Sequence, residues 1–231
     1  MGINSGFRIM LDNGLQTEII YSFVIILCSL MIYFGTKELY ELSNHKGIKY
    51  LREAFLFFAI AFFFRSFIKV FFILANHPLI IGISSLFFQA VTLFIFIYFS
   101  SIAIFYLISS MMWKKWKTHN GKIYIFHALA LIISIISLFF NSARIYLVIN
   151  ILILMFIIAM TIIAYSDSKK QNKKRLDLYA IYMLLFTFWS LNVLDVLIPK
   201  VLQTFQLIIY LASSGIFLWI LYKVLKKSGS N

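Results

Sequence analysis

The stretch AFLFFAIAFFFRSFIKVFFILA, residues Ala54–Ala75, decides the fold, because it is apolar over a length that can cross a bilayer. It nevertheless carries two cations, Arg65 and Lys69, well inside its ends. A cation at membrane depth costs at least about 2.5–3.5 kcal/mol, so it normally faces a bundle interior, a wet cavity or a partner charge. Residues four apart in a helix share one face. The stretch therefore predicts a membrane helix whose cationic face points toward other helices.

The composition of the whole chain also favours a membrane protein. Of its 231 residues, 62% are hydrophobic and 13% are charged, whereas soluble domains are about half apolar and a quarter charged. The apolar residues fall in blocks of about 20, which is the length of a membrane-spanning helix. Nothing is left over for a soluble domain, so we predict an all-α, multi-pass protein of the cell membrane with one domain over residues 1–231.

Seven apolar blocks follow one another along the chain, separated by polar connections or by short turns. The turn Asn76-His77-Pro78 is the clearest of these, because proline moves the residue before it out of helical conformation. We therefore expect seven transmembrane helices, at about residues 18–34, 54–75, 79–112, 123–140, 145–165, 178–198 and 201–222.

Lysine and arginine are distributed unevenly between the two sides of this arrangement. Sixteen of the 21 lie in the C-terminal tail and in the connections after the first, third and fifth spans, and three lie on the other side. The positive-inside rule therefore predicts that the N-terminus is outside and the C-terminus cytoplasmic. The basic connections suit anionic lipid at the cytoplasmic face or an acidic cytoplasmic protein partner. Because this distribution explains the net charge of +13, we expect no nucleic-acid partner.

The polar residues inside the spans gather in the outer half of the predicted bundle. At about 1.5 Å per residue, Lys69 lies about 24 Å and Asp195 about 26 Å from the inner ends of their helices. Asp195 is the one acidic residue that we expect among the apolar runs to answer the two cations. The candidate ligand-binding residues are Arg65, Lys69, Gln89, Asn150, Trp189, Asn192, Asp195, Gln203 and Gln206.

Three interpretations of this polar set remain open. The residues could line a small cavity that opens to the outside. They could instead form a structural ion-pair cluster that fixes how the helices align. The cations could also extend to lipid headgroups. One carboxylate beside two cations leaves one positive charge, so a ligand of the cavity should be neutral and polar, or anionic.

The sequence favours a sensor or receptor-like module that binds a small polar or anionic ligand and signals through its basic cytoplasmic loops. The alternative is a small transporter or channel with Arg65, Lys69 and Asp195 on its path, although few residues break the spans at mid-membrane. We expect no enzyme and no catalytic residues, because no nucleophile–base pair or phosphate-binding glycine loop is present. The four histidines lack the spacing of metal ligands, so neither a metal nor a cofactor is expected.

Seven spans, an outside N-terminus and short outer turns resemble the layout of microbial rhodopsins. That family attaches retinal to a lysine midway along its seventh helix, where this chain has Leu211, Ala212, Ser213 and Ser214. The resemblance therefore implies a shared topology without retinal. SWEET-type sugar transporters also share seven spans and this orientation, but their Pro-Gln motif is missing. The frequent use of Ile, Phe, Lys and Asn indicates a prokaryote with an AT-rich genome.

Overall fold

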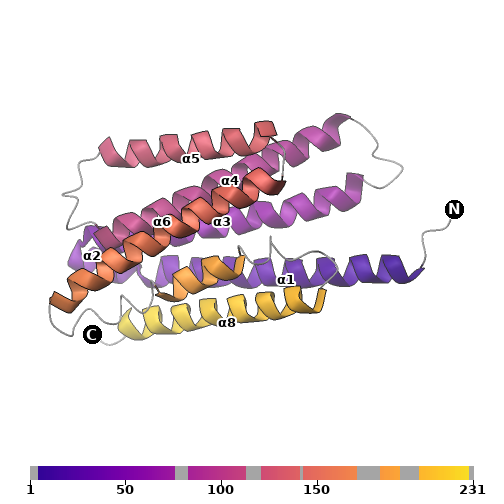
Figure 1. The fold of residues 1–231 in the computed structure, drawn as a ribbon. Helices are drawn as coiled ribbons and strands as arrows, with labels where there is room; N and C mark the ends of the chain where they lie inside the picture. The colour runs from indigo at the N-terminus through magenta and orange to yellow at the C-terminus, as the bar shows by residue number, and fades with distance from the viewer. Residues whose placement is uncertain are drawn as a thin grey trace.

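A computed structural model describes residues 5–75, 83–112, 121–140, 143–170, 183–192 and 203–228 of the chain. Within these ranges all regular structure is helical, which confirms the predicted all-α class (Figure 1). The helices are α1 Ser5–Gly35, α2 Lys37–Ser43, α3 Lys46–Ala75, α4 Ile83–Met112, α5 Gly121–Phe140, α6 Ala143–Lys170, the helical segment Met183–Asn192 and α8 Gln203–Ser228.

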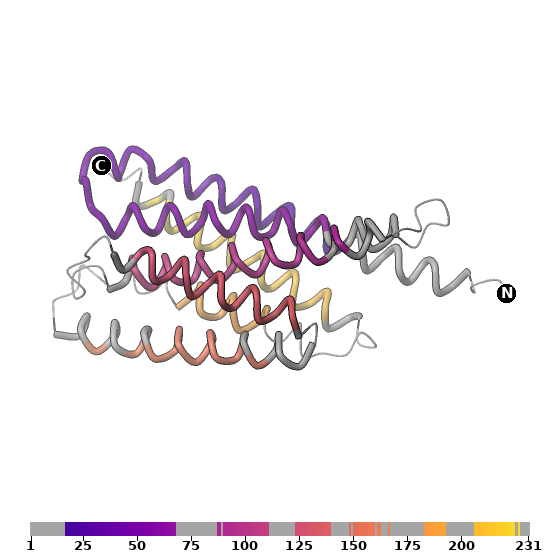
Figure 2. Tube along the Cα trace, turned by 90° about the horizontal axis from the view of Figure 1, so that it is seen from above, coloured from indigo at the N-terminus to yellow at the C-terminus, as the bar shows by residue number. Residues whose placement is uncertain are grey.

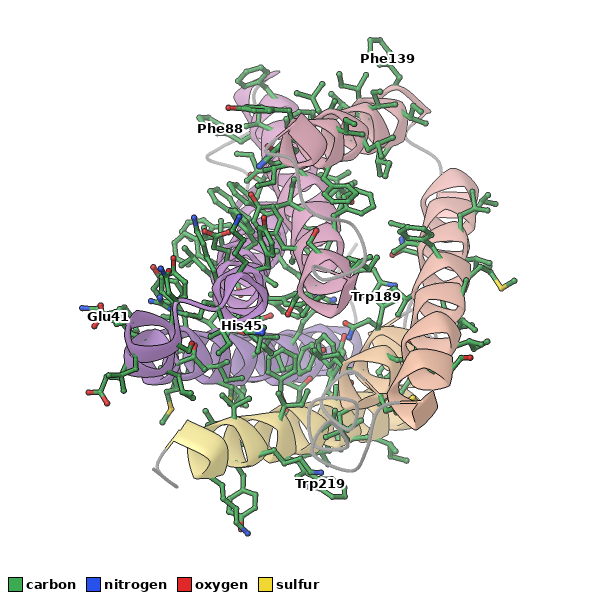
Figure 3. The ribbon with its side chains drawn as sticks, turned by 90° about the vertical axis from the view of Figure 1, so that its left-hand side faces the viewer. Glu41, His45, Phe88, Phe139, Trp189 and Trp219 are labelled. Atoms are coloured by element: carbon green, nitrogen blue, oxygen red, sulfur yellow. The ribbon has the colours of Figure 1, made fainter. Side chains whose placement is uncertain are left out.

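The long helices run along one common direction, as Figures 1 and 2 show. Helix α3 is central, because it packs extensively on both α4 and α1. Helix α8 packs on the side of α1, and α5 packs on α4. Helix α6 makes few contacts with α4 and α5, and the view along the bundle in Figure 3 shows it standing apart from them. The tightest packing therefore lies around α3.

Several helices extend beyond the apolar runs that predicted them. Helix α1 begins at Ser5 rather than near Glu18, and α3 begins at Lys46 rather than at Ala54. Among the described residues, three helical stretches are long and apolar enough to cross a bilayer: Thr17–Ser43, Ala90–Ser110 and Gln206–Val224. These lengths are compatible with a membrane protein, whereas the count of seven spans and the orientation stay predictions.

The surface of the bundle is rich in large apolar side chains, whereas many hydroxyl groups lie inside. The side chains of Phe23, Phe34, Phe87, Phe139, Leu152 and Leu211 are all more than half exposed. Figure 3 shows Phe88 and Phe139 pointing away from the bundle. In contrast, Ser22, Ser29, Ser134 and Ser213 are fully buried. Extensive apolar surface of this kind is typical of a protein that meets lipid or partner proteins.

Some of the buried hydroxyl groups are satisfied within their own helix, whereas those of Ser22, Ser29 and Ser213 make no hydrogen bond. Thr92 donates to the carbonyl of Phe88 at 2.6 Å, and Ser134 donates to the carbonyl of Ala130 at 2.7 Å. Bonds to the carbonyl four residues earlier need no second helix and no water. They therefore allow polar residues to sit inside an apolar bundle at small cost.

Arg52 closes the turn that α2 makes between α1 and α3. Its Nε donates to the carbonyl of Tyr33 at 3.1 Å, and its guanidinium lies over the rings of Tyr33 and Tyr40, 4.9 and 5.5 Å from their centres. Asn44 ends α2 in the left-handed conformation, at φ 46°, which asparagine tolerates better than most residues. These contacts hold α1 and α3 antiparallel to each other.

Candidate functional site

The antiparallel register of α1 and α3 brings two opposite charges to one level. The ring of Tyr21 meets that of Phe62 edge-on, with ring centres 5.7 Å apart. Three residues further from the α2 turn on each helix, Glu18 of α1 meets Arg65 of α3. At about 1.5 Å per residue, Glu18 and Arg65 lie about 25 and 29 Å from the ends of α1 and α3 that the α2 turn joins. The pairing therefore follows from the geometry of the helical hairpin.

Glu18 and Arg65 form a buried ion pair. Nε of Arg65 lies 3.3 Å from Oε1 of Glu18, and the two side chains are only 17% and 6% exposed, respectively. The guanidinium also lies 5.8 Å from the ring centre of Tyr21 and 5.6 Å from that of Phe62. The faces of aromatic rings attract cations. Arg65 is therefore held inside the bundle by a carboxylate and by two aromatic rings.

Asn192 extends this ion pair to the helical segment Met183–Asn192. Its Oδ1 accepts hydrogen bonds from Nη1 of Arg65 at 3.3 Å and from the hydroxyl of Tyr21 at 3.2 Å. The Tyr21 ring in turn stacks on that of Tyr210 in α8, with ring centres 4.6 Å apart. We refer to Glu18, Tyr21, Arg65, Asn192 and Tyr210 as the Arg65 cluster. It joins four helical elements that are distant in sequence.

Of the predicted binding residues, Arg65 and Asn192 are the two that the described contacts bring together. Trp189 and Asn150 are each 8% exposed, and Trp189 lines a separate cavity. Gln206 is half-buried on α8. The side chains of Lys69, Gln89 and Gln203, and all of Asp195, lie outside the described residues.

The expectation that Asp195 is the one acidic residue able to answer Arg65 is wrong, because Glu18 lies in the bundle and pairs with it. Sequence reasoning placed Glu18 at the boundary of the first span, where charge costs little. Because α1 begins at Ser5, Glu18 lies in the middle of the helix rather than at its start. The signal in the sequence is the helical spacing of Glu18, Tyr21, Ile25 and Cys28, which all lie on one buried face.

A second polar cluster, which is partly buried, joins α4 to α5, and sequence reasoning missed it. The hydroxyl oxygen of Tyr98 lies 2.8 Å from Nδ1 of His127, and the hydroxyl oxygen of Tyr106 lies 3.2 Å from Nε2. The two tyrosines are eight residues apart and therefore share a face of α4. A neutral imidazole has one donor and one acceptor, so one tyrosine hydroxyl donates to the ring and the other accepts from it. We call these three residues the His127 cluster.

Among the described residues, no group of three or more histidine, cysteine, aspartate or glutamate side chains is placed to hold a metal ion. Hydrogen bonds hold both clusters together, and the Arg65 cluster also contains an ion pair. The Arg65 cluster offers the richer set of groups, with a guanidinium, a carboxylate, an amide and a phenol in mutual contact.

The chain is similar to a protein of the archaeon Archaeoglobus fulgidus. The two are 27% identical over 224 residues, which cover 92% of this chain and 93% of that protein. That relative is described as an uncharacterized protein, so the similarity carries no function. No family model matches the chain, and no solved structure matches it.

Proposed function

We propose that the chain is a seven-helix protein of the cell membrane that acts as a sensor or receptor-like module. A small polar ligand enters the outer half of the bundle and acts on the Arg65 cluster, and the basic cytoplasmic loops pass the signal to a partner protein. The observation that supports this proposal is the ion pair of Glu18 and Arg65, whose hydrogen bonds tie together elements from both ends of the chain.

The mechanism rests on the contacts that a ligand would exchange. Asn192 holds both Arg65 and Tyr21, and Tyr21 stacks on Tyr210 of α8. A ligand that takes over one hydrogen bond of Arg65 or Asn192 changes how these elements pack. A ligand shifts a conformational equilibrium by its difference in affinity for the two states. The cluster provides such a difference, because the protein contacts exist only in the packed state.

Glu18 changes the class of ligand that we favour. With Glu18 counted, the charges of Arg65 and Lys69 are matched in number by those of Glu18 and Asp195. The excess positive charge that pointed to an anion is then absent. We therefore favour a neutral polar or zwitterionic ligand over a simple anion.

Exchanging the charges separates a ligand site from a purely structural clasp. Full-length protein in lipid nanodiscs is unfolded thermally with glycine, glucose, acetate or inorganic phosphate present, as wild type and as the double variant Glu18→Arg/Arg65→Glu. We expect glycine or glucose to raise the Tm of the wild type, and the exchange to abolish that shift while the protein still folds. The matched control exchanges the exposed pair on α2, Lys37→Glu/Glu41→Lys, and keeps the shift.

The four compounds stand for zwitterionic, neutral, carboxylate and phosphate ligands. If none of them moves the Tm of the wild type, the proposal of a polar ligand fails. A shift that survives the exchange of Glu18 and Arg65 places the ligand elsewhere. A shift in Tm caused only by acetate or phosphate would mean that the ligand is an anion.

A small transporter or channel is the second candidate, and the presence of two polar clusters within the bundle favours it. Tyr106 of the His127 cluster contacts Tyr50 and Phe57 in the first half of α3, whereas Arg65 lies in its second half. Ionisable groups at more than one depth are what a proton path requires. Proteoliposomes loaded in turn with dyes sensitive to pH, to chloride and to sodium test this candidate. An absence of proton, chloride and sodium flux removes it, and flux that stops in Glu18→Gln supports it.

A further inference from the structure

The His127 cluster holds one imidazole between two hydroxyl groups of a single neighbouring helix. Helix α5 lies along α4 (Figure 1), and the ring of His127 reaches Tyr98 through Nδ1 and Tyr106 through Nε2. Both hydrogen bonds are partly buried, so the ring is not sealed inside the bundle. Both ring nitrogens therefore have a partner, and each partner is a hydroxyl.

A hydroxyl suits either protonation state of an imidazole. A neutral ring has one N–H and one lone pair, whereas a protonated ring has two N–H groups and no acceptor. A backbone carbonyl only accepts, so it would fix one nitrogen as the donor. A tyrosine hydroxyl both donates and accepts, so the hydroxyl that donates to the neutral ring can turn and accept from the protonated ring. His127 therefore keeps two hydrogen bonds in both states, and neither helix has to move.

Packing holds the two tyrosine rings of the cluster in place. Tyr106 meets the rings of Tyr50 and Phe57 edge-on, with ring centres 5.9 and 5.0 Å apart. Tyr98 meets the ring of Phe99 edge-on at 5.3 Å between centres. Because the rings are held, a change in the protonation of the imidazole turns a hydroxyl group rather than a whole side chain.

The helices that carry the cluster contain no acidic residue to answer a charged imidazole. Neither α4 nor α5 contains aspartate or glutamate, and the other titratable residues of α5 are Lys122 and Tyr124. The described side chains of α6 include no titratable group. An anionic partner for the ring must therefore come from α3.

Helix α3 supplies that anionic group. The carboxylate of Glu53 acts electrostatically on the hydroxyl of Tyr106, as does the hydroxyl of Tyr50. Glu53 also pairs with Lys49, with Nζ and Oε1 3.8 Å apart, and its side chain is 30% exposed. The negative charge of Glu53 favours a proton on the cluster, whereas Lys49 weakens that effect.

The cluster lies near one end of the bundle and stops inside it. Tyr106 and His127 each lie six residues, about 9 Å, from the ends of α4 and α5 that we predict to be cytoplasmic. Deeper than Tyr98, the described part of the bundle packs through apolar side chains of α3, α4 and α5, which include Ala61, Phe96, Ile97 and Ile133. This arrangement suits uptake of a proton from one side rather than conduction across the bundle.

We propose that Tyr98, Tyr106 and His127 form a proton-binding site, through which the pH at the predicted cytoplasmic end changes the charge between α4 and α5. A proton from water binds the lone pair of the neutral imidazole, and the ring becomes an imidazolium that donates to both tyrosine oxygens. The hydroxyl that had donated to this lone pair turns its proton away and accepts instead. The site is independent of the ligand that we propose for the Arg65 cluster.

Nuclear magnetic resonance of labelled histidine measures this proton directly. Full-length protein with carbon-13-labelled histidine is titrated in lipid nanodiscs from about pH 8 to about pH 4. The signal that is missing from His127→Phe belongs to His127, and in the wild type it should change from neutral to charged. Tyr98→Phe and Tyr106→Phe each remove one acceptor of the charged ring, and charge-assisted hydrogen bonds are the stronger ones. Each variant should therefore lower the titration midpoint of His127 by about half to one pH unit.

The matched control is Tyr124→Phe, the same replacement at a side chain of α5 that is 75% exposed, and it should leave the midpoint unchanged. Thermal unfolding shows that each variant is folded. A ring of His127 that stays neutral throughout the titration would overturn the proposal. An unchanged midpoint in both Tyr98→Phe and Tyr106→Phe would also overturn it, because the hydroxyls would then not hold the charged ring. An equal effect of Tyr124→Phe would overturn it as well, because the shift would not depend on the two hydrogen bonds.

Discussion

The Arg65 cluster and the His127 cluster place polar groups inside the same bundle in different ways. The Arg65 cluster contains a full ion pair and joins four elements, two of them from the distant C-terminal part of the chain. The His127 cluster joins two neighbouring helices through hydroxyl groups and one imidazole. A buried charge is tolerated only with its partner, whereas a neutral hydrogen bond can be lost at moderate cost. The two clusters should therefore respond very differently to mutation.

Removing one charge of the ion pair should have the largest effect on stability. Arg65→Ala leaves the carboxylate of Glu18, which is 6% exposed, without its guanidinium partner. Breaking a buried pair in this way costs about 3–5 kcal/mol. Equilibrium unfolding in detergent micelles measures the loss. A loss below about 1 kcal/mol would mean that Glu18 is solvated by water or paired with another cation. The ion pair would then contribute no more to stability than an exposed surface pair does.

Removing both charges together should restore most of that stability. The double variant Glu18→Leu/Arg65→Met replaces the pair with apolar side chains of similar length and leaves the hydrogen bond from Tyr21 to Asn192 in place. Such replacements are often neutral or stabilising, so we expect a free energy of unfolding within about 1 kcal/mol of the wild type. The same unfolding experiment measures it.

The double variant also separates stability from function. If it stays as unstable as Arg65→Ala, the pair contributes more than its charges. If it is stable but no longer responds to the ligand of the wild type, the ion pair serves binding rather than folding.

Mutation of the His127 cluster should lower the free energy of unfolding by less than Arg65→Ala does. In His127→Phe an aromatic ring remains, but the hydroxyls of Tyr98 and Tyr106 lose their partner on α5. Leaving buried polar groups unsatisfied costs about 1–3 kcal/mol. Tyr98→Phe, which removes one hydrogen bond with little change in volume, is the graded comparison and should cost about 1 kcal/mol. A loss from His127→Phe as large as that from Arg65→Ala would remove the distinction between the clusters.

The sequence predicted the fold class and part of the Arg65 cluster, but nothing of the His127 cluster. The all-α class followed from apolar blocks of spanning length, and Arg65 stood out because a cation inside such a block needs a partner. Its partner did not stand out, because Glu18 lies at the edge of the apolar run and the end of a helix is poorly marked in sequence. Tyr98, Tyr106 and His127 are ordinary in an aromatic-rich chain. Only the packing of α4 on α5 shows that they meet.

The smallest effect should come from an ion pair that differs from Glu18–Arg65 mainly in its surroundings. Lys37 and Glu41 lie one turn apart on α2, with Nζ and Oε1 3.8 Å apart, and their side chains are 59% and 60% exposed. Water screens such a pair and its side chains lose entropy when they meet, so Lys37→Ala should cost at most about 0.5 kcal/mol. Unfolding at low and at high salt provides the comparison. Salt should abolish the effect of Lys37→Ala but leave that of Arg65→Ala unchanged, because buried charges are screened much less. Equal sensitivity to salt would mean that solvent reaches Glu18 and Arg65, and the distinction between a buried charged cluster and the protein surface would be lost.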